Sequence, residues 1–127
     1  MIVGIGTDIV RVSRIRRLLE RYPNFVTRVF SDGEIDYCRQ RSSPEQSYAA
    51  RFAAKEAVMK ALGTGWDGRV NWRDIEVVSA GEGGPKIMLQ NGAWDKMAEL
   101  EAYRAHLSLS HESDYALAFV VLERQKT

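Results

Sequence analysis

Glu56 and Lys60 are the charged residues whose types and spacing could do chemistry. At 100° per residue they lie about 40° apart on a helix, beside alanines that would leave room for a ligand. The segment around them is otherwise apolar, which predicts burial, and a buried charge needs a partner or a metal. Magnesium suits such a carboxylate, because water and phosphate oxygens complete its shell, and the lysine would neutralise a phosphate.

The same pattern has an ordinary interpretation. A Glu-to-Lys pair four residues apart is common on solvent-facing helices and stabilises them by only about 0.2–0.5 kcal/mol. Asp8, which follows a short apolar stretch, is by itself typical of a turn or a helix cap. Spacing does not show that Asp8 meets Glu56, so a shared metal site does not follow from these residues alone.

A second set of polar side chains lies near the end of the sequence. Residues 106–111 read HLSLSH, and strand alternation places His106, Ser108 and Ser110 on one face. That face is either an ordinary half-solvated surface or a row of donors for a phosphate or nucleotide. A Ser-His nucleophilic pair is less favoured, because alternate residues of one strand rarely supply both the base and its orienting group.

The elements that position Asp8 are a strand over residues 2–7, which ends at Asp8, and a helix over 9–21 that stops before a proline. Gly4 and Gly6 lack the third glycine of a dinucleotide-binding fingerprint. We therefore interpret them as positions of close backbone packing.

Capping-box patterns at Ser31 and Ser43 should each begin a helix. The second places a proline at the first helical position and predicts the longest helix, over 44–62, which ends at Gly63. After this helix the pattern predicts a hairpin, with strands over 75–78 and 87–89 around a turn at 81–85. A short helix capped by Asn91 and reaching about 100 should follow. Two strands are predicted at the end, over 103–110 and 115–123. The mixture is α+β in one domain, residues 1–127.

The composition is that of a globular protein, with 45% hydrophobic residues, 28% charged residues and a net charge of +1. Cys38 is the only cysteine, which excludes an intrachain disulfide and a cysteine-based zinc site. Neither a signal peptide nor a membrane helix is indicated. We expect a cytoplasmic protein with no membrane partner.

The segment between residues 11 and 28 is strongly basic, with Glu20 as its single acid. Such a segment favours an acidic partner. A nucleic-acid-binding module is a rival from another class, since phosphate contacts need little beyond basic charge. The arginines are Arg11, Arg14, Arg16, Arg17, Arg21 and Arg28.

Three segments, in this order and separation, resemble the holo-acyl-carrier-protein synthases, the small single-domain 4′-phosphopantetheinyl transferases. They are GIGTDIV at residues 4–10 with Arg14 after it, RFAAKEA at 51–57 continuing through Lys60 to 65, and HLSLSH at 106–111. The resemblance covers essentially the whole chain. It implies the fold of that family, an α+β domain with a long helix packed on an antiparallel sheet.

The resemblance also implies a site. Asp8 and Glu56 would hold Mg²⁺, Lys60 would assist with phosphate, and Arg51 and His106 would bind the phosphates of coenzyme A. The family implies a homotrimer with sites between subunits, so that Asp8 and Glu56 could come from different copies.

The implied reaction is attack of a carrier-protein serine on the β-phosphorus of coenzyme A, which gives a phosphopantetheinyl serine and adenosine 3′,5′-bisphosphate and supports fatty acid biosynthesis. The general base stays open among Glu56, a water on the metal, and Glu34. The acyl carrier protein would contact Arg14, with Arg17 and Arg21 beside it, and we expect no nucleic acid partner. A noncatalytic protein that kept the fold is disfavoured by the intact acids and lysine.

Overall fold

The computed structural model describes residues 1–64, 68–79, 81 and 83–126, so the predictions that fall on Gly65 and Glu82 lie outside it. No helix in this part of the chain has the length and hydropathy that a membrane crossing requires. In chain order the elements are β1 (Ile2–Arg11), α1 (Val12–Arg21), α2 (Phe25–Val29), α3 (Asp32–Arg39), α4 (Pro44–Leu62), the 3-10 helix η1 (Trp72–Asp74), β2 (Ile75–Ser79), β3 (Pro85–Leu89), α5 (Asn91–Glu99), β4 (Ala102–Glu112) and β5 (Tyr115–Arg124).

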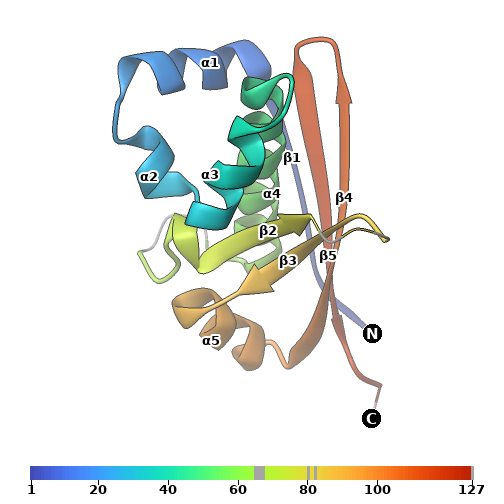
Figure 1. Cartoon of the computed structure of the whole chain (residues 1–127). Helices are drawn as coiled ribbons and strands as arrows, with labels where there is room; N and C mark the ends of the chain where they lie inside the picture. Colours follow the sequence, from blue (N-terminus) through green and yellow to red (C-terminus); the bar gives the residue numbers. More distant parts are fainter. Residues whose placement is uncertain (65–67, 80, 82, 127) are drawn as a thin grey trace.

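Helix α4 runs through the middle of the molecule with a sheet on either side (Figure 1). One sheet has three antiparallel strands in the order β1-β5-β4, and the other is the β2–β3 hairpin. The predicted α+β class, with a long helix packed on an antiparallel sheet, is confirmed. The hairpin and the two C-terminal strands also form as predicted, with slightly wider bounds.

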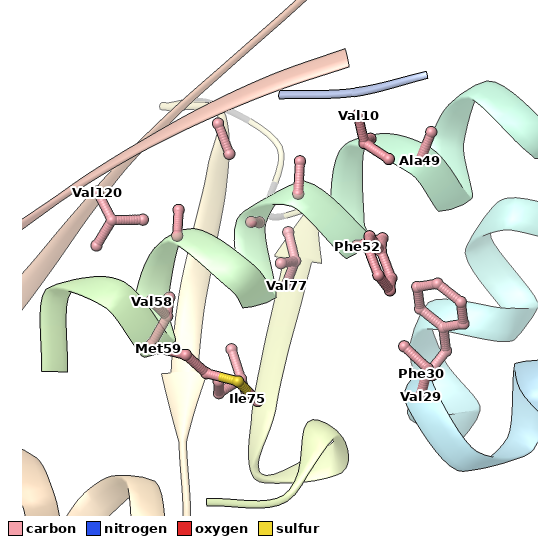
Figure 2. Packing of buried hydrophobic residues seen from close by; sticks show 14 of the residues in the cluster. Val10, Val29, Phe30, Ala49, Phe52, Val58, Met59, Ile75, Val77 and Val120 are labelled. Atoms are coloured by element: carbon pink, nitrogen blue, oxygen red, sulfur yellow. The ribbon is translucent and has the colours of Figure 1, made fainter. Parts of the chain in front are cut away.

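The hydrophobic core is built around α4. Val10 and Val120 face the helix from the three-stranded sheet, whereas Ile75 and Val77 face it from the hairpin (Figure 2). Because apolar layers cover it on both sides, α4 is buried on most of its circumference, as its composition predicts. Glu56 therefore lies on a helix whose position is fixed by packing.

The glycines of β1 let the strand approach α4 closely. A methyl group on Gly6 would overlap the carbonyl oxygen of Ala57, and one on Gly4 would overlap that of Ala61. This confirms close backbone packing at both glycines. The expectation that alanines beside Glu56 leave room for a ligand is wrong at Ala57, because the strand backbone occupies that space.

The boundary between β1 and α1 differs from the prediction. The strand continues past Asp8 to Arg11, and the helix begins at Val12 rather than at residue 9. Ile9 is paired with Leu117 of β5 and is 59% exposed, while Val10 is the residue that enters the core. Pairing with a long neighbouring strand thus overrides the helical spacing of the apolar residues.

The predicted caps are confirmed at one of three positions. Ser31 forms a complete capping box with Glu34 at the start of α3. Ser43 precedes Pro44 as predicted, but its side chain makes no capping bond, since its backbone lies outside the extended geometry that directs the hydroxyl at the helix. Asn91 is inside α5, and its amide donates to Asp74 instead (3.1 Å).

Candidate functional site

The structure brings Asp8, Glu56 and Lys60 together where β1 crosses α4. The ammonium nitrogen of Lys60 donates to Asp8 Oδ1 (3.1 Å) and to the carbonyl oxygen of Thr7 (3.0 Å). Asp8 is also close enough to Glu56 for its charge to raise the pKa of that carboxyl. One chain is therefore sufficient to bring the two acids together, so Asp8 and Glu56 need not come from different copies.

The electrostatics of this cluster suit a cation. Burial raises the pKa of Glu56, the negative charge of Asp8 raises it further, and the charges of Lys60 and Arg14 oppose that rise. Two partly desolvated carboxylates that repel each other are stabilised by a positive ion. Within the described ranges no group of three or more histidine, cysteine or acidic residues could hold a metal. A pair of carboxylates fits Mg²⁺, which usually retains water and binds substrate phosphates.

Glu56 also lines a groove of about 570 Å³ between α1, α2 and α4. The ring of Phe52 stacks on that of Trp72, with centroids 5.1 Å apart, and forms one wall of the groove. An apolar groove lined in part by a carboxylate can hold an aliphatic or aromatic group of a substrate near a reacting phosphate. The other lining residues are Arg14, Leu18, Tyr22, Pro23, Asn24, Phe25, Arg28 and Val29.

The arginines predicted to contact a partner lie on the exposed side of α1. Arg14, Arg17 and Arg21 line a second hollow of about 200 Å³ on that helix. Arg14 also lines the groove, where its guanidinium lies 5.8 Å from the centroid of the Phe52 ring. The basic surface and the acid pair are therefore neighbours.

Arg51 points away from this cluster. Five residues of helix place it about 140° around α4 from Glu56. It is 4% exposed, its Nη2 donates to Ser79 Oγ (2.7 Å), and its guanidinium lies over the Tyr37 ring at 4.1 Å. Its buried Nε has no hydrogen-bond partner among the described residues. The Ser79 hydrogen bond lowers the pKa of Tyr37, and Arg41 and Arg51 add to that effect.

His106 lies on the outer face of the three-stranded sheet, whereas Asp8 faces α4 on the inner side. His106 Nε2 is 2.9 Å from Glu123 Oε1, and this hydrogen bond is the main reason that the pKa of Glu123 is lowered. His106 also lines a polar hollow of about 580 Å³ between β3 and β4. A single chain therefore does not unite Asp8 with His106.

Comparison with known proteins shows the family of this chain. The model of the 4′-phosphopantetheinyl transferase superfamily matches residues 4–120. The chain belongs to this superfamily. A curated relative, the holo-[acyl-carrier-protein] synthase of Methylobacterium radiotolerans, is 48% identical over 97% of this chain and 94% of its own length.

Solved structures of the transferase superfamily share the fold. The holo-[acyl-carrier-protein] synthase of Neisseria meningitidis is 40% identical, with a TM-score of 0.89 over 98% of this chain and 100% of that one. The Helicobacter pylori enzyme, solved in complex with coenzyme A, is 32% identical, with a TM-score of 0.82 over 94% of this chain and 99% of that one. The fold is therefore that of the phosphopantetheinyl transferases.

Sequence reasoning misses one residue of the groove and the surroundings of Glu34. Trp72 reaches the groove from a 3-10 turn that no periodicity predicts. Glu34, weighed above as a base, is fully buried and bonds Lys55 Nζ (2.8 Å), with Lys55 also donating to the carbonyls of Trp72 and Ile75.

Both carboxylate oxygens of Glu34 are occupied, since Oε1 also accepts from Ser31 N (2.8 Å) and Oε2 from Val77 N (2.9 Å). Burial lowers the pKa of Lys55, and the Glu34 charge opposes that effect. Glu34 therefore has a structural role, and its occupied oxygens are not available to act as a general base.

Proposed function

We propose that this chain is a holo-[acyl-carrier-protein] synthase, which transfers 4′-phosphopantetheine from coenzyme A to a serine of apo acyl carrier protein. The observation that carries the proposal is the cluster of Asp8, Glu56 and Lys60, in which Glu56 also lines an apolar groove. Relatives of this name span nearly the whole chain, and one was solved with coenzyme A. We also propose a cytoplasmic location and a part in fatty acid biosynthesis, which follow from the activity.

In the proposed reaction the serine oxygen bonds to the β-phosphorus of coenzyme A, and the bond from that phosphorus to the bridging oxygen breaks. Adenosine 3′,5′-bisphosphate leaves with that oxygen. Asp8 and Glu56 are suited to hold Mg²⁺, which when bound supplies positive charge against the charge that develops on the phosphate oxygens. Lys60 is 54% exposed in its side chain and can exchange its bond to Asp8 for one to phosphate.

We assign the removal of the serine proton to Glu56 rather than to Glu34. Glu56 lines the groove, where a substrate hydroxyl can approach its carboxylate. Glu34 is closed off by its bonds to Lys55 and to backbone amides.

The acyl carrier protein is proposed to dock on α1. Arg14, Arg17 and Arg21 offer a positive surface, and Arg14 extends it to the groove beside Glu56. A negatively charged carrier would be attracted to this surface, and an attraction of this kind raises the rate of encounter and weakens with salt.

We propose that the protein works as a homotrimer with sites between subunits. The outer face of the β1-β5-β4 sheet exposes Ile5, Ile9, Leu117 and Phe119 at 58%, 59%, 38% and 42%. Contiguous apolar surface of this kind usually marks an interface. Within a single chain Arg51 and His106 lie away from Asp8. A neighbouring copy would supply these two side chains to the phosphates of the coenzyme bound at Asp8.

Mass measurement tests the function. The purified chain is incubated with coenzyme A, Mg²⁺ and an apo acyl carrier protein, and the carrier should gain the mass of phosphopantetheine. Chelation of the metal, or the Asp8→Asn variant, should prevent the gain. An unchanged carrier mass with the wild-type chain would reject the proposal, and full transfer by Asp8→Asn would reject the metal assignment.

A further inference from the structure

Asp114, in the turn between β4 and β5, is bonded to the start of helix α1. Its carboxylate accepts from the backbone amide of Ser13 (3.0 Å, Oδ1) and from the Ser13 hydroxyl (2.8 Å, Oδ2). Its carbonyl oxygen accepts from the amide of Val12 (2.7 Å). Figure 1 shows the first turn of α1 beside the closed end of this hairpin. The hairpin therefore supplies a cap that the helix lacks in its own sequence.

Helix α1 has particular need of such a cap. It has ten residues, and helices of that length are marginal in water without tertiary support. Arg11 stands at the N-cap position without a side-chain capping bond, and the first turn contains no acidic residue. Positive arginine charges at this end interact unfavourably with the helix dipole. An aspartate instead accepts hydrogen bonds from the free backbone amides and carries the negative charge that the dipole favours.

The cap lies next to the surface that matters for recognition. Ser13, which Asp114 holds, directly precedes Arg14, and Arg14 lines both the groove with Glu56 and the hollow with Arg17 and Arg21. Movement of the first turn would displace Arg14 first. The groove lining on α2 and α4 does not depend on this bond.

We propose that Asp114 is a positioning residue for carrier recognition, which acts by fixing the first turn of α1 and with it Arg14. This inference rests on the proposed function and adds to it a residue in the hairpin turn. Its effect is on the binding of the carrier protein, and coenzyme A binding is independent of it.

The test compares Asp114→Ala with Asp114→Asn and with the control Asp95→Ala, which removes an exposed acid from α5. Binding of apo carrier protein is measured by calorimetry, and KM for carrier and for coenzyme A and kcat are measured by turnover. We expect Asp114→Ala to raise the carrier Kd and KM by about three- to ten-fold, the factor that corresponds to loss of a typical helix cap. Its coenzyme A KM should match that of Asp95→Ala.

The Asp114→Asn variant shows whether the hydrogen bond to Ser13 or only the negative charge of Asp114 is needed. Asparagine keeps an oxygen that can accept from the Ser13 amide, so Asp114→Asn should restore most of the carrier affinity. Amide hydrogen exchange in the first turn of α1 should be faster in Asp114→Ala and near wild type in Asp114→Asn. Thermal unfolding of each variant checks that the rest of the chain remains folded.

Two outcomes would overturn the inference. One is an active wild-type chain whose carrier Kd is the same in Asp114→Ala and Asp95→Ala. The other is a loss in Asp114→Ala that affects carrier and coenzyme A equally and is not restored by asparagine. Failure of the proposed function gives a different result, because the wild-type chain itself would neither bind nor modify the carrier.

Discussion

At the scale of single residues, the ionised carboxylate of Glu56 destabilises the folded chain. Burial and then the charge of Asp8 raise its pKa above the ordinary value. A group whose pKa is raised on folding holds its proton more tightly in the folded chain. At neutral pH the ionised side chain therefore lowers the free energy of unfolding, and this penalty develops as pH rises through the folded pKa.

Glu56→Gln should accordingly make the metal-free protein more stable at pH 7.5 while reducing transfer by at least about 100-fold, the scale of a lost general base. The gain should vanish below about pH 4, where the wild-type carboxyl is largely protonated in both states. Thermal unfolding in chelator across this pH range measures it, with Glu20→Gln, on the exposed side of α1, as control. A lower melting temperature for Glu56→Gln at pH 7.5 would show that the carboxylate is stabilising.

The members of this cluster differ in how far the sequence predicts them. Glu56 and Lys60 are related by helical spacing, which is local and can be derived from residue types. Asp8 enters through the packing of β1 on α4, which spacing does not encode. Only the family resemblance joins it to Glu56, and the structure supplies the physical reason through the bond from Lys60 to Asp8.

At the scale of elements, the distance between Asp8 and Glu56 is set by how closely β1 lies on α4. Gly6 is two residues from Asp8 on the same strand, and its missing side chain allows the backbones to meet. Any side chain at this position must push the strand outward.

Gly6→Ala should therefore destabilise the fold by about 1–3 kcal/mol and weaken magnesium-dependent transfer, because Asp8 moves with the strand. Gly33→Ala is a suitable control, since its methyl would lie 3.1 Å from a movable carboxylate oxygen of Glu76 rather than against backbone. Urea unfolding and transfer assays measure the two effects. Equal stability of Gly6→Ala and the wild type would contradict this account of the packing.

Element types are predicted well here and element ends less well. The long α4 and the β2–β3 hairpin carry strong local signals in their composition and in the positions of proline and glycine. The strands β4 and β5 are marked by their alternation and by the polar turn between them. The end of β1 depends on the ten-residue partner strand β5, which continues the ladder to Arg11 opposite Tyr115. The cap of α1 by Asp114 is equally nonlocal, and no residue near the helix predicts it.

At the scale of the whole molecule, one face of the three-stranded sheet is covered by α4 and the other exposes apolar side chains. Apolar surface on both faces of a sheet in a single chain calls for a second partner, which we propose to be another copy.

Phe119→Glu should then separate the trimer into monomers and reduce transfer, because a charge is placed on the face that copies share. Trp94→Glu, at a position on α5 that is 61% exposed, is the matched control and should leave assembly intact. Sedimentation velocity measures the oligomeric state. A wild-type chain that is monomeric and fully active would refute the assembly.

The buried pair of Lys55 and Glu34 gives the two lysines of α4 opposite chemical accessibility. The side chain of Lys55 is 0% exposed and that of Lys60 is 54% exposed, although the two lie little more than one helical turn apart. Amine-reactive reagents should acylate Lys60 in the native protein and reach Lys55 only after unfolding. Covalent labelling can therefore follow ligand protection at the site through Lys60 and loss of the fold through Lys55, in the same peptide.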